Sequence, residues 1–128
     1  MKLLLDTHLL VWAIGVSKRL SAAADALMRD PANELIFSAA SIWELAIKSS
    51  RPRPDLQFDP PVLRRTLLDI GYQELSITGL HMLTIVRLPA LHKDPFDRLL
   101  VAQAISEGIL LLTSDPVVAR YPGPIRLV

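Results

Sequence analysis

The sequence of 128 residues contains no cysteine, which excludes disulfide bonds, thiolate metal sites and cysteine nucleophiles. It also lacks any apolar run that approaches the roughly 18 residues needed by a membrane-spanning helix. The apolar part of the N-terminus, residues 3–5, is too short for a signal peptide. We therefore expect a cytoplasmic protein that does not associate with membranes.

Familiar site motifs are missing as well. Neither G-x-x-x-x-G-K-[ST] nor G-x-G-x-x-G occurs, which excludes the nucleotide-binding loops that these patterns form. The three histidines, His8, His81 and His92, do not have a metal-binding spacing, and none lies beside a nucleophile in the sequence. The histidines are therefore weaker candidates for an active site than the acidic residues, although His8 lies beside Asp6 and could contact a substrate or simply pack.

Charge is nearly balanced, while apolar residues are abundant. The net charge of +1 says little about nucleic-acid binding, although Lys48, Arg51 and Arg53 lie close together and Arg64 and Arg65 follow them. These cations either bind a partner or only solvate a surface, and both alternatives stay open.

Hydrophobic residues make up 51% of the chain, which is enough to fill the core of a single domain over residues 1–128. The surplus predicts a buried oligomer or partner surface.

Short apolar runs alternate with helical patterns along the whole chain. We expect strands over 2–5, 34–37, 73–77, 109–113 and 125–128. We expect helices over Thr7–Ala13, Ser21–Arg29, Ser38–Ser49, Asp59–Gly71, Thr78–Arg87 and Asp94–Gly108, from caps, prolines and glycines at their ends. Trp12 and Trp43 lie in helical apolar patterns and are predicted core residues. The alternation predicts an α/β fold with a mainly parallel sheet flanked by helices.

Four acids occupy the positions that a metal site would need. Asp6 and Asp115 each follow an apolar strand, whereas Glu44 and Asp97 lie early in predicted helices. In a parallel sheet the ligand crevice lies outside the carboxyl ends of the strands, so all four can converge there. Crowded carboxylates need a counter-charge, and hard divalent cations prefer oxygen ligands. The pattern therefore predicts a Mg²⁺ site, with Mn²⁺ as an alternative, that hydrolyses a phosphodiester.

Each of these acids also has a purely structural interpretation. Asp6 and Asp115 can cap the helical turns that follow them, and for either residue alone the cap is favoured. Ser41 and Glu44 match the S-x-x-E capping box, but Ser38 offers an earlier cap that would place Glu44 in the second turn. For Glu44 the two interpretations stay open.

Asp94 and Asp97 begin the same predicted helix with different expected roles. Asp94 precedes Pro95 and is predicted to be the N-cap. Asp97 borders an apolar stripe that includes Phe96 and Leu99, and a carboxylate at the edge of a packed face requires a partner. We therefore assign Asp97 to the metal and Asp94 mainly to the cap.

Four segments of the chain resemble PIN-domain ribonucleases of the VapC toxin type. They are residues 3–12, 38–48, 92–104 and 112–115, which occur in the family's order and span nearly the whole sequence. The resemblance implies a PIN domain that cleaves RNA endonucleolytically with Mg²⁺. It assigns metal roles to Asp6, Glu44, Asp97 and Asp115, with Asp94 as an adjunct. It also implies a homodimer that is neutralised by a VapB-type antitoxin.

The sequence departs from this family at one place and leaves two other functions to weigh. Residues 51–54 (Arg-Pro-Arg-Pro) replace the glycine-containing turn expected there. One alternative is a binding or scaffold module that has lost catalysis, which the presence of all four acids argues against. Another is a phosphotransfer protein, but Asp6 is not followed two residues later by the second acid of aspartyl-phosphate phosphatases.

Overall fold

A computed structural model of the protein describes residues 1–15, 19–49 and 59–128, so the Arg51–Pro54 stretch lies outside the described residues. The strands are β1 (Lys2–Leu5), β2 (Glu34–Ser38), β3 (Gln73–Leu75), β4 (Leu110–Thr113) and β5 (Ile125–Leu127). The helices are α1 (Thr7–Ile14), α2 (Ala22–Arg29), α3 (Ala39–Ser49), α4 (Pro60–Asp69), α5 (Gly79–Val86) and α6 (Pro95–Glu107), with a 3₁₀ turn η1 (Val118–Arg120). All the predicted strands and helices are present. The edge strands β3 and β5 end earlier than predicted, and β4 begins one residue later than predicted.

The five strands form one parallel sheet in the order β3-β2-β1-β4-β5, which confirms the predicted fold class. From β1 the chain passes first to β2 on one side and later to β4 on the other. A crevice is expected where the strand order reverses in this way, which here lies between β1 and β4. In the register of this pair Leu5 lies opposite Leu112, so the two strands end side by side. The residues that follow Leu5 and Leu112, which are Asp6 and Thr113, are therefore neighbours.

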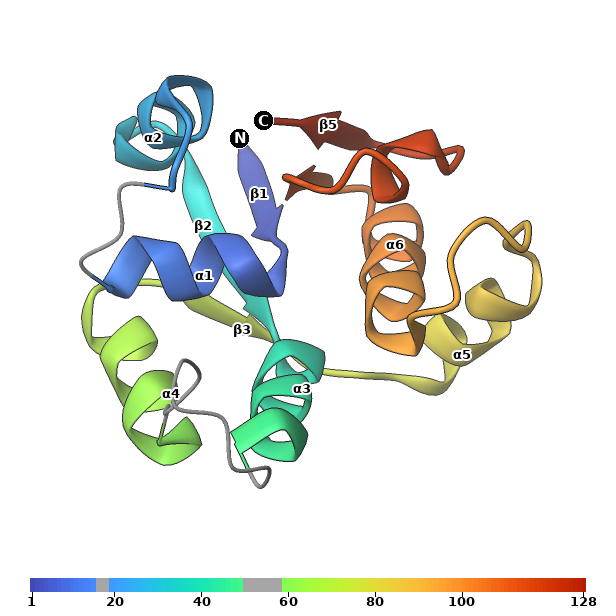
Figure 1. Ribbon diagram of the computed structural model, residues 1–128, viewed down its shortest axis with the longest axis horizontal. Helices are drawn as coiled ribbons and strands as arrows, with labels where there is room; N and C mark the ends of the chain where they lie inside the picture. The colour runs from blue at the N-terminus through green and yellow to red at the C-terminus, as the bar shows by residue number, and fades with distance from the viewer. Residues whose placement is uncertain (16–18, 50–58) are drawn as a thin grey trace.

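The sheet separates two hydrophobic cores, because successive side chains of a strand point to opposite faces. Leu3 and Leu5 of β1 pack into one core with residues of α1, α2 and α4, whereas Leu4 packs into the other with residues of α6. Figure 1 shows these helices on the two sides of the sheet. All three leucines are fully buried, and burial of each stabilises the fold by about 1.5–3 kcal/mol.

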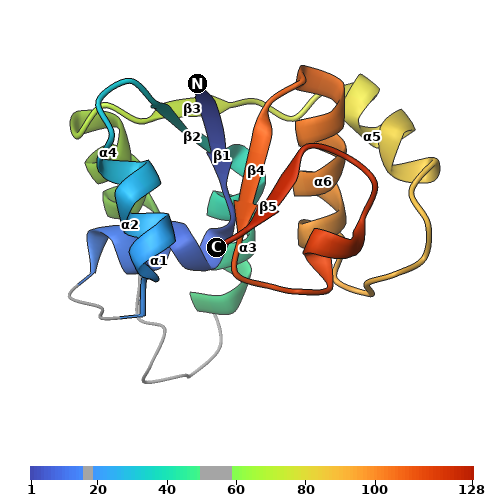
Figure 2. The ribbon, with the colours of Figure 1, turned by 90° about the horizontal axis from the view of Figure 1, so that it is seen from above.

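Helix α3 lies at the carboxyl edge of the sheet, where it contacts α1, α4 and α6 (Figure 2). Ser38 ends β2, and its hydroxyl accepts a hydrogen bond from the backbone N–H of Ala40. The helix thus begins directly after Ser38, which places Glu44 in the second turn. The capping-box interpretation of Ser41 and Glu44 is therefore wrong, and Glu44 is available to the site.

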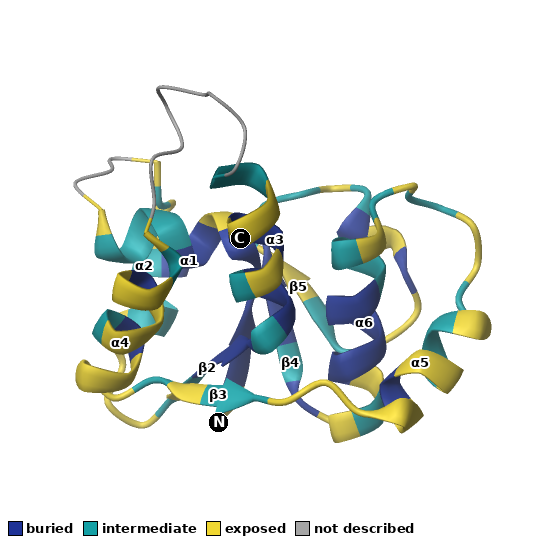
Figure 3. Cartoon of the chain, turned by 90° about the horizontal axis from the view of Figure 1, so that it is seen from below, coloured by how far each residue is buried: buried dark blue, intermediate teal, exposed yellow. Residues whose placement is uncertain are grey.

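The prediction that Trp43 belongs to the core is also wrong. Its side chain is 55% exposed and contacts Phe96 edge to face, with ring centroids 4.9 Å apart. Trp12 is partly buried against the core below α1, as predicted. Buried residues concentrate in the central strands and in the inner face of α6, while α5 is exposed along most of its length (Figure 3). None of the helices in the described part of the chain is long and apolar enough to cross a membrane.

Candidate metal centre

Asp6 both caps helix α1 and lines the candidate site. Its Oδ1 accepts from the backbone N–H of Leu9 at 2.9 Å, which makes it the N-cap of α1. Its Oδ2 accepts from Thr113 Oγ1 at 2.8 Å and from the N–H of Ser114 at 3.2 Å. Burial raises the pKa of Asp6, and these hydrogen bonds offset part of that rise. The side chain is therefore held rigidly beside the end of β4.

Asp115 follows β4 and uses its two carboxylate oxygens differently. Oδ1 accepts from the N–H of Val117 at 2.8 Å and so closes the turn that precedes η1. Oδ2 lies 3.1 Å from Nε2 of His92, in the loop before α6. The structural role expected of Asp115 thus occupies one oxygen only, and the other faces the acidic cluster.

Of the two acids at the start of α6, only Asp94 caps the helix, as the sequence predicts. Asp94 Oδ1 accepts from the N–H of Phe96 at 2.8 Å and of Asp97 at 3.4 Å, which confirms Asp94 as the N-cap of α6. The Asp97 carboxylate makes no capping bond; its Oδ2 lies 3.3 Å from His92 Nε2. Asp97 therefore projects from the first turn of α6 toward Asp115.

Glu44 reaches the same edge from α3 and is buried. Its Oε1 accepts from Thr7 Oγ1 at 2.7 Å, and Oε2 pairs with Lys48 Nζ one turn later in α3 at 2.5 Å. Thr7 Oγ1 also lies 2.9 Å from Ser41 Oγ. The start of α1 and the middle of α3 are thus joined through this carboxylate.

The electrostatics link Asp97 to three of the other predicted acids, Asp94, Glu44 and Asp6. The pKa of Asp97 is raised to about 7, first by burial and then by the negative charges of Asp94 and Glu44, with a smaller contribution from Asp6. His92 acts in the opposite direction and lowers it. Asp97 is thus the carboxyl group on which the charges of the other acids act.

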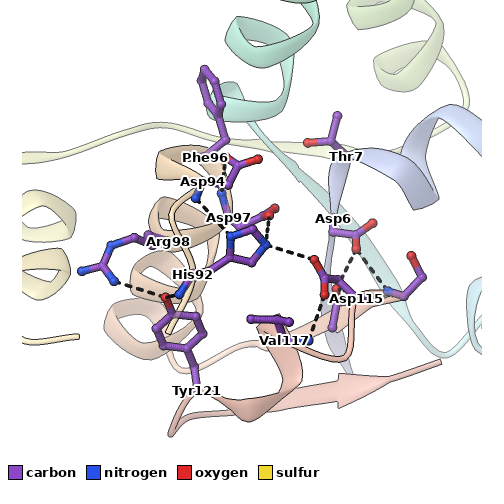
Figure 4. A network of polar contacts seen from close by, with 12 residues as sticks. Asp6, Thr7, His92, Asp94, Phe96, Asp97, Arg98, Asp115, Val117 and Tyr121 are labelled. Carbon is purple, nitrogen blue, oxygen red and sulfur yellow. Dashed lines mark hydrogen bonds and ion pairs between the residues drawn. The ribbon is translucent and has the colours of Figure 1, made fainter. Parts of the chain in front are cut away.

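Three side chains come close enough to hold a single ion. His92, Asp97 and Asp115 each offer a ligand atom, and these atoms lie within 4.8 Å of one another, the one such group among residues 1–15, 19–49 and 59–128. Figure 4 shows Asp97 and Asp115 beside the His92 ring, with Asp6 next to Asp115. A cluster of carboxylates that raises the pKa of its own member fits a hard divalent cation, because the cation relieves the repulsion.

Sequence reasoning missed several residues of this site. His92 received no role, although it lies two positions before Asp94 in one of the four segments that resemble the family. Thr7 and Lys48 hold Glu44, and Thr113 holds Asp6. Thr113 is the last residue of β4, and Thr7 lies two residues after the end of β1, so their nearness to strand ends is the local signal that could have indicated them.

Comparison with known proteins decides the family. The family model described as PIN domain matches residues 3–124, nearly the whole chain. The chain belongs to the PIN domain family. It is 35% identical to the protein named Ribonuclease VapC22 of Mycobacterium tuberculosis (strain ATCC 25618 / H37Rv), over 97% of this chain and 96% of that protein. The family resemblance inferred from the four sequence segments is confirmed.

Solved structures show the same PIN fold at low sequence identity. The crystal structure of VapBC2 from Rickettsia felis bound to a DNA fragment from the promoter contains a chain with a TM-score of 0.73 at 18% identity, covering 99% of this chain and 98% of that one. A chain of DNA-bound VapBC from Salmonella typhimurium has a TM-score of 0.67 at 14% identity, with 98% and 97% covered. The arrangement of sheet and helices is thus shared over the full length of the domain.

Proposed function

We propose that this protein is a metal-dependent endoribonuclease and the toxin of a type II toxin–antitoxin module, acting as a single PIN domain over residues 1–128 in the cytoplasm. The observation that carries the proposal is the convergence of carboxylates at the carboxyl edge of the sheet, where the pKa of Asp97 is raised to about 7. A site of this kind favours a bound cation at neutral pH. The similarity to a protein named as a ribonuclease supports RNA as the substrate.

The donor set suits Mg²⁺, with Mn²⁺ as an alternative. Asp6, Glu44, Asp97 and Asp115 would hold the ion through carboxylate oxygens, which are the ligands that both cations prefer. When bound, the ion supplies a water of lowered pKa and stabilises negative charge on the phosphate. Asp94 would assist the metal site through its negative charge, since its Oδ1 accepts the hydrogen bonds that cap α6.

The surroundings of the site support a polyanionic substrate. A cleft of about 350 Å³ opens beside Asp94 and is lined in part by Lys48 and Lys93. Lysine ammonium groups bind phosphates as compact positive charges. The RNA backbone would therefore lie along this cleft, with the phosphate to be cleaved at the acidic cluster.

Cleavage of a labelled single-stranded RNA by purified protein tests the function. We expect cleavage with Mg²⁺ or Mn²⁺ and none with EDTA. Asp97→Asn keeps the shape of the side chain and removes its charge, so its rate should fall by several orders of magnitude. Asp69→Asn is the matched control, because Asp69 is exposed at the end of α4, away from the cluster.

Two results would contradict the proposal. Wild-type cleavage that survives EDTA would show that no metal is needed. An Asp97→Asn protein as active as Asp69→Asn would show that the acidic cluster is not the active site. Wild-type protein that binds RNA without cutting it would favour the binding module instead.

We also propose two protein partners, a second copy of the chain and a VapB-type antitoxin. The antitoxin is supported by the solved structures with the same fold, which are named as VapBC complexes. The homodimer is supported by α5, where Leu80, Leu83 and Val86 are 61%, 66% and 82% exposed. Exposed apolar side chains gathered on one helix are typical of an interaction site.

Light scattering and co-purification test the two partners separately. We expect a dimer at tens of micromolar, and we expect Leu83→Glu, which places a charge in the middle of the α5 face, to shift it toward monomer. A wild-type monomer under these conditions would contradict the dimer. The antitoxin is tested by co-expression with the small reading frame expected upstream, whose product should co-purify with the chain.

A further inference from the structure

We propose that His92 is a positioning residue: its N–H donates to the Asp115 carboxylate beside Asp97, and it does not bind the metal itself. The inference rests on the proposed metal site. The three side chains lie close enough to be taken for a ligand set of one imidazole and two carboxylates. The hydrogen bonds around the ring assign the imidazole a different role.

The tautomer of the ring is set by the backbone. The N–H of Asp94 donates to Nδ1 of His92 at 3.0 Å, so Nδ1 must present its lone pair there. A neutral imidazole has one donor nitrogen and one acceptor nitrogen, and the hydrogen is therefore on Nε2. Nε2 is the atom that faces Asp115 Oδ2 at 3.1 Å and Asp97 Oδ2 at 3.3 Å. A nitrogen whose hydrogen points to the Asp115 carboxylate has no lone pair to offer a cation.

The backbone of His92 is held in place by residues other than the acids. The backbone N–H of His92 donates to the hydroxyl of Tyr121 at 2.8 Å, and Tyr121 is only 3% exposed. Arg98 donates to the same hydroxyl at 3.2 Å and to the carbonyl oxygens of Pro89 and Ile85 at 2.9 and 3.3 Å. Figure 4 shows Arg98 and Tyr121 on the side of His92 that is away from Asp115. The loop before α6 is thus tied to α6 and to the end of η1.

The carboxylates can still bind a cation beside His92, because each carboxylate oxygen offers two lone-pair sites. Asp115 has Oδ1 engaged by Val117, so the bond from His92 to Oδ2 fixes the remaining freedom of the group. For Asp97, Oδ2 faces His92, and Oδ1 accepts no hydrogen bond from the described residues. A donor that orients ligating carboxylates in this way raises metal affinity, and its removal typically weakens binding about 10–100-fold.

The two roles for His92 predict different metal preferences. With His92 as a donor, the protein contributes only oxygen atoms, which suit Mg²⁺ and Mn²⁺. With His92 as a ligand, the site would contain an imidazole nitrogen and would suit Zn²⁺ much better. Loss of the imidazole should then weaken Zn²⁺ binding far more than Mn²⁺ binding.

Calorimetric titration of the purified chain with Mn²⁺ and with Zn²⁺ separates these roles. We expect His92→Ala to weaken the binding of Mn²⁺ and of Zn²⁺ by a similar factor of about 10–100. His92→Gln should restore most of the Mn²⁺ affinity, since the glutamine side-chain amide can place an N–H near the former Nε2. Tyr121→Phe, which removes the hydroxyl behind the ring, should weaken Mn²⁺ binding to a smaller extent. Tyr72→Phe is the matched control and should leave the affinity unchanged, because Tyr72 packs against the other core.

Three results would overturn the inference. They are an unchanged Mn²⁺ affinity in His92→Ala, a much larger loss for Zn²⁺ than for Mn²⁺, and pulsed electron paramagnetic resonance that detects a nitrogen bonded directly to Mn²⁺. Far-ultraviolet circular dichroism establishes that each variant is folded, and the glutamine variant distinguishes lost donation from lost packing. A wild-type protein that binds no Mn²⁺ would remove the metal site and this inference together. A wild-type protein that binds Mn²⁺ but cuts no RNA would contradict the ribonuclease while the role of His92 is still measured.

Discussion

Asp97→Asn should stabilise the metal-free protein at neutral and alkaline pH while abolishing cleavage. The pKa of Asp97 is raised from 3.8 to about 7, which means that the folded protein holds a proton on this group that the unfolded chain releases. Between these two pH values the free energy of unfolding of the wild type therefore falls as pH rises. Asparagine has no charge to lose, so the variant lacks this dependence.

The size of the effect follows from the same shift. The difference between 3.8 and about 7, at roughly 1.36 kcal/mol for each pH unit, corresponds to about 4 kcal/mol once Asp97 is fully charged. The side chain is 21% exposed, so solvent screens part of this repulsion. The variant also weakens the electrostatic contact between Asp97 Oδ2 and His92 Nε2, which lie 3.3 Å apart, and this loss offsets about 1 kcal/mol. We expect a net gain of about 1–3 kcal/mol above pH 7 and a gain close to zero near pH 4.

Urea denaturation in EDTA from pH 4 to pH 8 measures this difference directly. The difference in free energy of unfolding between Asp97→Asn and wild type should increase as pH rises from 3.8 to about 7. Asp69→Asn, at an exposed position, should show no such trend. A gap that is independent of pH, or a variant less stable than wild type at pH 8, would refute the argument that crowded carboxylates strain this site.

Three further predictions concern the residues around Asp97. Asp94→Ala should lose about 0.5–2 kcal/mol of stability in urea, as deletion of an N-cap does, and retain measurable cleavage; a stable but inactive variant would reverse the roles of Asp94 and Asp97. Mg²⁺ at a hundredfold excess over its dissociation constant should add about 2.7 kcal/mol to the stability of wild type, seen as a higher melting temperature; an equal shift in Asp6→Asn would count against the site. Gln103→Leu should lose about 1–3 kcal/mol, because the Ser38 hydroxyl donates to this fully buried amide and would be left unpaired. Its Mn²⁺ affinity should not change, and a large change would place Gln103 in the metal centre.

The sequence by itself determined the alternation of elements and half of the candidate site. Apolar runs, prolines and glycines are local signals, so strands and helices could be located from them to within a few residues. Asp6 and Asp115 directly follow apolar runs, and the ends of parallel strands meet at one edge whatever the strand order. Asp94 could be recognised as a cap because a cap is defined by its immediate neighbours.

Only the tertiary structure decided which side chains complete the site. Glu44 could not be distinguished from a capping-box residue until the start of α3 at Ser38 placed it one turn later, against Thr7. Trp43 lies in a helical apolar pattern but is exposed beside Phe96. Hydrophobic periodicity identifies the apolar face of a helix, but it does not show whether another element covers that face. His92 meets Asp115, 23 residues away along the chain, because α6 packs against β4 and the loop before α6 is tied to Tyr121. Contacts between residues so far apart in sequence depend on strand order and loop anchoring, which local patterns do not encode.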